Sequence, residues 1–171
     1  MIELDVVLAG IDEHATRRAS FHHGDLHWQA VAHAGLELLP EVPGCDAEVV
    51  LLFALFHDSQ RWNEHEDPGH GTRGAALARE LHGRGFELAE ARLETLSAAC
   101  EGHTDGRTSD DPTIGVCWDA DRLNLWRVGT VPDPEFLSTR PACNPERIGA
   151  AATWHGPEYG WGRLAERYGV G

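Results

Sequence analysis

The spacing of hydrophobic and polar positions predicts a chain built from amphipathic helices. Apolar residues recur three and four positions apart in several segments, and Pro, Gly and short polar runs separate these segments. Asp25 and Asp46 stand where N-caps of the first two long helices are expected. The polar segment 59–69 is expected to be a loop. The predicted helices cover residues about 26–39, 47–58, 70–82, 87–100 and 114–127.

The second of these segments is apolar on every side. Residues 49–56 read VVLLFALF, without a polar position. A helix that is hydrophobic all round is expected to be buried at the centre of a protein. A buried parallel strand is the alternative, but the length of the run and its Leu, Ala and Phe content favour a helix.

The two ends of the chain have weaker patterns. Residues 1–20 are compatible with a short helix. The segment from about 129 to 171 is rich in Pro and Gly, so we expect an irregular wrap with short helices near 145–152 and 162–168. No segment has the composition of a linker. We therefore expect a single all-α domain over 1–171, with a helical bundle as its core at about 20–128 and an irregular C-terminal extension.

Composition narrows the possible functions. The net charge is −14, which disfavours a broad surface for extended nucleic acid. All 14 basic residues are Arg, so chemistry that needs a lysine Schiff base or a P-loop lysine is excluded. The four cysteines form no CxxC pair, and the acidic N-terminus does not resemble a signal peptide. We expect a cytoplasmic protein without a membrane span; the sequence does not predict its oligomeric state.

An adjacent His57-Asp58 pair ends the apolar segment. These residues follow Phe53 and Ala54 at i−4, so both continue buried faces of the expected helix. A buried carboxylate without a partner is costly, and a divalent cation held with a neutral imidazole removes that cost. The pair therefore indicates a metal site, although a purely structural role for it is about equally compatible with the pattern.

Other polar residues also lie near helix ends or on apolar faces. Asp121 has Cys117, Leu125 and Val128 as helical neighbours and is read as a ligand, whereas Asp119 is read as a surface or supporting acid paired with Arg122. Single histidines that stand near a helix end or on an apolar face are His27, His70 and His103. Convergence of several helices on one interior point is how bundles build metal sites.

The remaining histidines have less specific surroundings. His33 is expected in the core, and His82 at a helix end is expected to act as a cap. Surface or substrate-edge positions are expected for His14, His22, His23, His65 and His155.

Three local motifs in order resemble the HD-domain superfamily of metal-dependent phosphohydrolases. GDLHWQAV is similar to the family's first-helix motif, FALFHDSQ to the helix that ends in its His-Asp doublet, and CWDADRLN to its closing DADRLD segment. The resemblance implies a five-helix core and a ligand set of His27, His57, Asp58 and Asp121.

Two further segments bear on the number of metal ions. HGTRGAALA resembles the HPxxGA helix start of two-metal HD proteins, and GHTDG resembles their next His-containing loop. The resemblance therefore adds His70 and His103 as ligands, with Asp58 between two ions. His and carboxylate ligands suit one or two divalent ions of Mn, Fe, Co, Ni, Zn or Mg. The GYP signature of HD-GYP proteins is absent, so their cyclic-di-GMP specificity is not expected. Arg61 and Trp62 stand where alarmone hydrolases have an acidic pair, which disfavours that activity.

The resemblance implies hydrolysis of a small phosphorylated substrate, such as a nucleotide, by metal-activated water. Arg61 and Arg73 are expected to bind phosphate oxygens. Asp58 and Arg61 are expected to be catalytic, with Glu64, or Asp67, as a general acid or base. Two alternatives stay open. The first is an HD-fold mixed-valent di-iron oxygenase; the short gap from His57 to His70 disfavours it, although His82 could take the place of His70 at a longer spacing. The second is a metal-binding sensor without catalysis.

Overall fold

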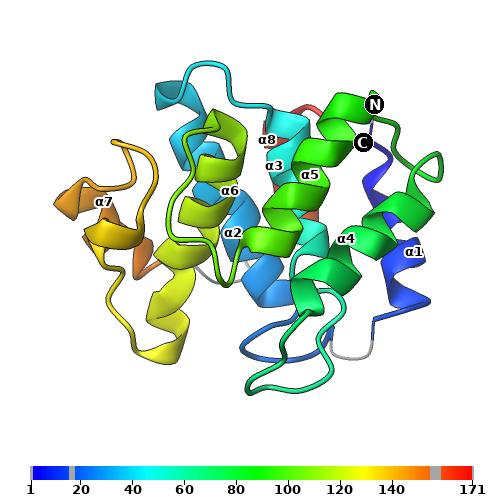
Figure 1. Ribbon diagram of the computed structural model, residues 1–171, viewed down its shortest axis with the longest axis horizontal. Helices are drawn as coiled ribbons and strands as arrows, with labels where there is room; N and C mark the ends of the chain where they lie inside the picture. The colour runs from blue at the N-terminus through cyan, green and yellow to red at the C-terminus, as the bar shows by residue number, and fades with distance from the viewer. Residues whose placement is uncertain (1, 16–17, 155–158, 171) are drawn as a thin grey trace.

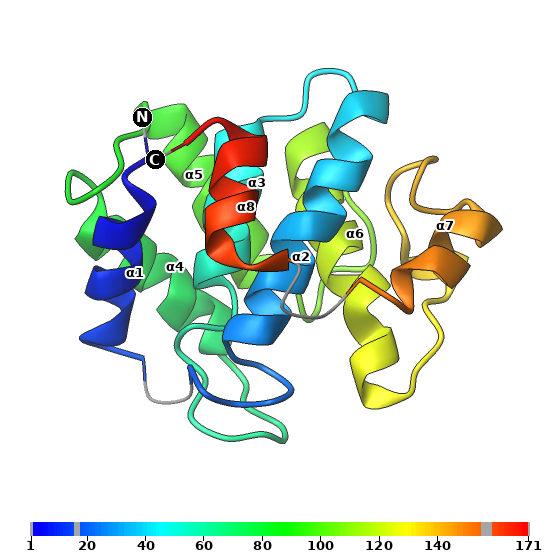
Figure 2. The ribbon, with the colours of Figure 1, turned by 180° about the vertical axis from the view of Figure 1, so that it is seen from behind.

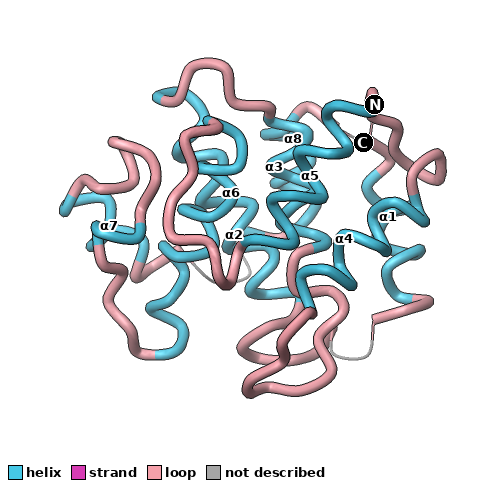
Figure 3. The backbone as a smooth tube through the Cα atoms, in the orientation of Figure 1, coloured by secondary structure: helices cyan, strands magenta, loops and turns pink. Residues whose placement is uncertain are grey.

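The computed structural model describes residues 2–15, 18–154 and 159–170, and these residues form helices, turns and one isolated β-bridge between Ile2 and Phe86 (Figures 1 and 3). The all-α prediction is confirmed. None of the described helices combines the length and apolarity needed to cross a lipid bilayer. The α-helices are α1 (Leu4–Asp12), α2 (Asp25–Leu38), α3 (Ala47–Phe56), α4 (His70–Leu81), α5 (Glu90–Gly102), α6 (Pro112–Leu123), α7 (Pro145–Ala151) and α8 (Trp161–Tyr168). Three short 3-10 helices lie between them in the described chain: η1 (Leu39–Glu41) after α2, and η2 (Asn124–Val128) and η3 (Pro134–Phe136) after α6.

Helix α3 lies at the centre of the bundle. It is in contact with α2, α4, α5, α6 and α8, and no side chain from Val49 to Phe56 is accessible to solvent. Helix α5 covers it on one side (Figure 1) and α8 on the opposite side (Figure 2). The uniformly apolar segment is therefore a central helix, as its composition predicts.

The N-termini of α2 and α3 differ in how they are capped. The Asp46 side chain accepts a hydrogen bond from the N–H of Val49, which confirms it as the N-cap of α3. The corresponding prediction for Asp25 is wrong, because Gly24 is the N-cap and Asp25 is the first helical residue. The Asp25 carboxylate accepts hydrogen bonds from side chains instead; the donors are Arg18, Gln29 and Trp161.

Two helix boundaries differ from the predicted ones. Helix α6 ends at Leu123, and the chain continues as the 3-10 helix η2 rather than as α-helix to residue 127. Leu125 and Val128 thus lie beyond α6, and the argument that placed them on the same α-helical face as Asp121 does not hold. Helix α5 begins at Glu90 instead of about 87, since the His82 ring hydrogen-bonds the backbone of Leu88 just before it.

The C-terminal segment returns to the bundle after its irregular part. Helices α7 and α8 lie near the two predicted positions. Helix α8 packs on α2 and α3, with Leu164 buried and the Tyr168 hydroxyl donating to the carbonyl of Ala32 at 2.8 Å. At the other end of the chain, α1 buries Val7 and Ile11 and packs on α4. Both ends therefore support the core.

Two glycines let α4 approach the ends of two other helices. A Cβ at Gly74 would clash with the carbonyl oxygen of Phe56 at the end of α3. A Cβ at Gly71 would clash with the carbonyl oxygen of Cys100 near the end of α5. Because these atoms belong to backbone, they cannot move aside as a flexible side chain could. The absence of side chains at these positions sets how closely α3, α4 and α5 come together.

We expect Gly74→Ala to lower the free energy of unfolding by about 1–3 kcal/mol, the usual cost of overpacking a tight contact. Gly149→Ala is the matched control, because Gly149 lies in α7 with no atom near its missing Cβ. That substitution should be neutral or stabilise by about 0.5–1 kcal/mol, since alanine favours helix. Urea unfolding of both variants measures the difference; a Gly74→Ala protein as stable as the native one would contradict the proposed close contact.

Candidate metal centre

Six buried or nearly buried side chains converge at one end of α3, and they form two groups. We call His27, His57 and Asp121 the first triad. The second triad consists of Asp58, His70 and His103. Within each triad, one ligand-type atom per residue lies within 4.8 Å of the others. These are the six residues for which the sequence and its resemblance predict a ligand role.

Helix ends bring these side chains together. His27 lies in the first turn of α2, and Asp121 in the last turn of α6. His57 and Asp58 directly follow α3, and His70 is the first residue of α4. His103 is the C-cap of α5. The close approach of α4 to α3 and α5 therefore determines where the second triad forms.

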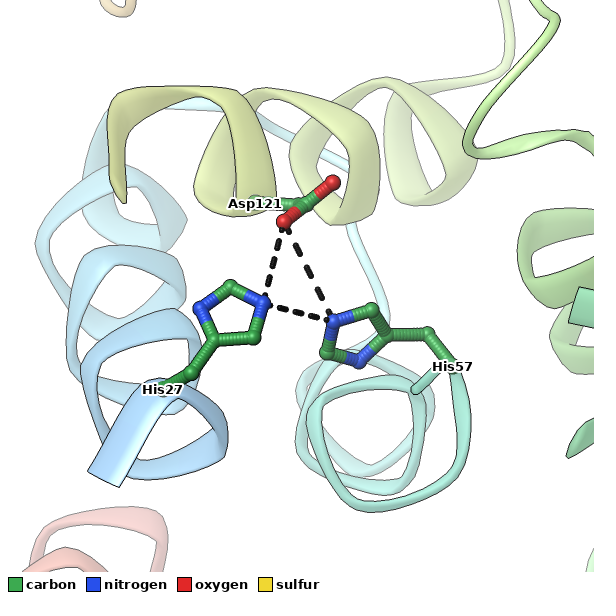
Figure 4. A group of neighbouring side chains, drawn as sticks. All are labelled: His27, His57 and Asp121. Atoms are coloured by element: carbon green, nitrogen blue, oxygen red, sulfur yellow. Dashed lines mark hydrogen bonds and ion pairs between the residues drawn. The ribbon is translucent and has the colours of Figure 1, made fainter. Parts of the chain in front are cut away.

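The first triad joins α2, α3 and α6 (Figure 4). His27 Nε2 lies 3.3 Å from Asp121 Oδ1, and His57 Nε2 lies 3.9 Å from the same oxygen. The two Nε2 atoms are 3.1 Å apart. All three groups thus point at one common position.

The second triad has a similar arrangement around one carboxylate oxygen of Asp58. Asp58 Oδ1 lies 3.1 Å from His70 Nε2 and 3.6 Å from His103 Nε2, and these two nitrogens are 2.9 Å apart. Asp58 Oδ2 faces the first triad, at 3.6 Å from His27 Nε2 and 3.9 Å from His57 Nε2. The Asp58 carboxylate therefore lies between the two triads and can serve both.

Each of the four histidines is oriented by an oxygen at its Nδ1. An oxygen of this kind only accepts, so each Nδ1 carries a hydrogen and the neutral ring keeps its lone pair on Nε2. The Nδ1 partners are Asn124 Oδ1 for His27 (2.7 Å) and the carbonyl oxygens of Phe53 for His57 (3.1 Å), Asp67 for His70 (2.7 Å) and Cys100 for His103 (2.7 Å).

This arrangement attracts positive charge. Two neutral Nε2 atoms at 3.1 or 2.9 Å cannot donate to each other, so a positive charge, either a metal ion or a proton on one ring, relieves the contact of their lone pairs. Burial lowers the pKa of His57 to about 3, which leaves its ring neutral. Burial alone would raise the pKa of Asp58, but the surrounding histidines hold it well below its ordinary value. A carboxylate and neutral imidazoles are the donor set that divalent metal ions prefer, so the residues fit such an ion.

Two cavities open onto the centre. The smaller has a volume of about 240 Å³, and its lining includes Asp58, His103, Asp121 and Arg127. The larger has a volume of about 540 Å³, and its lining includes Glu64, His70 and Thr72. Both are lined by His23, Arg61 and Thr104, so the cavities adjoin. A small molecule can therefore reach the triads from this side.

Three residues of the site have no assigned role in the sequence pattern. His23 is expected only at the surface or substrate edge, but its Nδ1 lies 2.9 Å from Asp58 Oδ2 and so contacts the second triad directly. Asn124 holds the His27 ring, and Arg127 lines the smaller cavity. The one available signal was that His23 precedes His27 by four positions. Asn124 and Arg127 belong to η2, which the helical pattern did not reveal.

The other histidines are distributed around the molecule. His65 lines the larger cavity, and His14 lies near Glu80 at the surface. His33 is buried, as expected of a core residue, and also accepts a hydrogen bond from Arg167 at 2.9 Å. His155 lies outside the described residues.

The loop between α3 and α4 carries the expected substrate and proton-transfer residues. Arg61 is buried beside Asp58 and His70, and Glu64 accepts a hydrogen bond from the Ser20 hydroxyl at 2.7 Å. Arg73 is not part of either cavity lining. Its guanidinium donates to Asp67 Oδ1 at 2.7 Å and to the Gln60 carbonyl at 3.1 Å, so it supports the loop from outside.

Asp67 is a structural acid in this loop. Burial alone would raise the pKa of its carboxyl, but hydrogen bonds from the Trp62 N–H and from Arg73 keep the pKa below the ordinary value. A carboxylate held ionised in this way is a poor proton donor, which disfavours Asp67 as the general acid.

The expected pairing of Asp119 with Arg122 is wrong. Asp119 is fully buried, and it accepts hydrogen bonds from the N–H groups of Ser138 and Thr139 at 2.6 and 2.8 Å. The Arg122 guanidinium donates instead to backbone carbonyls, among them that of Phe136 at 2.5 Å. Both side chains thus fasten the C-terminal segment to α6, because irregular backbone needs side-chain partners.

Comparison with known proteins supports the fold. No protein-family model and no curated protein matches the chain. A crystal structure of a predicted HD superfamily hydrolase from an uncultured Thermotogales bacterium is similar, with a TM-score of 0.64 and 22% identity. The match covers 90% of this chain and 87% of that one. The chain therefore has the HD-type helical fold, as the three motifs predict.

We expect Asn124→Ala to weaken metal binding by about 10- to 100-fold, because outer partners that orient a ligating His usually contribute this much. Asn144→Ala makes the same change at the N-cap of α7 and should leave metal affinity unchanged. Calorimetric titration of chelator-stripped protein with Mn²⁺ or Zn²⁺ compares the two. Equal affinities in the two variants would show that His27 is not held for a metal by Asn124.

Proposed function

We propose that the chain is a metal-dependent phosphohydrolase that acts on a small phosphorylated molecule. The observation that carries the proposal is the pair of buried His and carboxylate triads joined by Asp58, which an HD-type fold presents to two adjoining cavities. A surface with net charge −14 disfavours extended nucleic acid as the substrate, whereas cavities of this size suit a small molecule.

The ligand assignment follows the geometry. His27, His57 and Asp121 would hold one ion, and His70 and His103 a second, with Asp58 contributing one oxygen to each. A divalent ion held by these residues would lower the pKa of a bound water toward neutrality and would neutralise phosphoryl charge. The chain's task is to keep four imidazoles neutral and aimed, which the Nδ1 partners accomplish.

Two arginines can receive the phosphate group. Arg61 and Arg127 both line the smaller cavity, next to Asp58 and Asp121. Arg127 is positioned by its hydrogen bonds to the carbonyl oxygens of His22 (2.7 Å) and Asn124 (3.1 Å). A planar guanidinium matches phosphate oxygens, and the positive N-terminus of α4 at His70 adds to the same field.

Proton transfer falls to side chains at the cavity edge. His23 contacts Asp58 and lines both cavities, so it can pass a proton to or from a group bound beside the triads. Glu64 lines the larger cavity and is held by Ser20. We assign the general acid or base to one of these two residues, His23 or Glu64.

The activity is testable with chelator-stripped protein reloaded separately with Mn, Fe, Co, Ni, Zn or Mg. Phosphate release from an aryl phosphate and from nucleotides should appear with at least one metal. Asp58→Asn should lower kcat by more than about 100-fold, since even outer partners of metal ligands contribute 10- to 100-fold. Asp110→Asn is the matched control, because Asp110 is an exposed residue outside the linings of both cavities.

Two outcomes would contradict the proposal. Iron-dependent oxygen uptake without phosphate release would favour the di-iron oxygenase. Metal-dependent thermal stabilisation without turnover of any substrate would favour a sensor that binds metal without catalysis.

A further inference from the structure

The second triad already has a positive charge of the chain's own beside it. Arg61 Nη1 lies 3.1 Å from His70 Nε2 and 3.5 Å from Asp58 Oδ1. Arg61 is 8% exposed, and its other guanidinium nitrogens reach the carbonyls of His65 at 2.7 Å and Asn63 at 3.5 Å. The loop between α3 and α4 thus holds the cation against the ligand atoms.

The contact with His70 lies beside the atom that an ion would use. Arg61 Nη1 is 3.1 Å from His70 Nε2 and 3.5 Å from His70 Nδ1, so the guanidinium rests against the ring and not on the Nε2 lone pair. His70 Nδ1 donates to the Asp67 carbonyl, which leaves that lone pair on Nε2 for an ion. An ion held by His70 Nε2 and Asp58 Oδ1 would lie next to the guanidinium, so the two positive charges would repel each other.

The first triad is different. Asp121 lies 3.3 and 3.9 Å from the two histidines of its own triad. Arg127 lines the same cavity, but its guanidinium donates to the backbone oxygens of His22 and Asn124. The lone pairs of His27 and His57 face each other and Asp121 without an arginine hydrogen bond to either nitrogen among the described residues.

We propose that Arg61 competes with the second metal ion, so that the first triad fills first and the second binds an ion only when the guanidinium withdraws. Like charges in a site of low polarity repel strongly, and the loss of a charged hydrogen bond adds to the cost. The inference rests on the proposed metal centre of the phosphohydrolase, and it concerns how many ions the centre holds.

The competition has a consequence for substrate binding. With one ion in place, Arg61 supplies the second positive charge beside Asp58, and it faces both cavities. With two ions, the withdrawn guanidinium stays within these cavities, where a phosphate group would meet it. The number of ions therefore sets whether Arg61 pairs with the triad or with the substrate, and metal availability would regulate the site.

Calorimetric titration of the chelator-stripped protein with Mn²⁺, with electron paramagnetic resonance to detect paired ions, tests the competition. The native protein should show one tight site and a second at least about tenfold weaker. Arg61→Ala and Arg61→Met should tighten the second site about tenfold or more and leave the first unchanged. Arg61→Lys keeps the charge and should keep the second site weak, and His70→Ala should abolish it.

Arg79→Ala is the matched control, because Arg79 lies in α4, pairs with Glu90 and Glu94 at the surface instead of contacting the triads or the α3–α4 loop, and carries the same charge. Its second site should stay weak. Two equal sites in the native protein would overturn the proposed competition. A second site that stays weak in Arg61→Ala and Arg61→Met, with circular dichroism showing that both variants are folded, would also overturn it. Neither result would contradict the proposed metal centre itself. If neither the native protein nor any variant binds Mn²⁺ or another metal tested, the proposed metal centre itself is contradicted.

Discussion

The buried carboxylate of Asp58 is the constraint on which the rest of the structure depends. It lies among four imidazoles whose Nε2 atoms carry lone pairs, and it is almost completely buried. Helices α2 to α6 meet so that each contributes a nitrogen or oxygen at or next to one of its ends. Such a concentration of lone pairs and negative charge is unfavourable without a positive charge among them, so the chemistry of the centre points to a cation.

Backbone contacts make the centre rigid. Gly71 and Gly74 allow α4 to lie directly on the ends of α5 and α3. Carbonyl oxygens in the last turns of α3 and α5 orient His57 and His103, and the Asp67 carbonyl in the loop before α4 orients His70. Carbonyl oxygens in the last turn of a helix have room for a further partner, so they can accept from imidazole N–H groups. The ends of α3 and α5 therefore fix the directions of His57 and His103.

Positive charge near the centre comes from arginine, since the chain has no lysine. Arg61 lies against the second triad and Arg127 lines the neighbouring cavity, so one phosphate group could meet both guanidiniums and the metal site. This arrangement is typical of sites that stabilise charge on phosphoryl oxygens. Under the proposed function, it would let a protein with net charge −14 bind an anion at one protected position.

Local pattern in the sequence was enough to predict the helices and the central burial of residues 49–56. It also marked the His57-Asp58 pair as candidate ligands, because burial of a charged residue shows in its neighbours. Motif order added the HD-type fold and the other candidate ligands, and the ligand roles stay predictions. Only the tertiary structure showed which oxygen of Asp58 faces which triad, brought Asn124 and His23 to them, and assigned Asp119 to the C-terminal segment. These contacts join residues far apart in the chain or depend on a 3-10 turn, and neither leaves a periodic signal in the sequence.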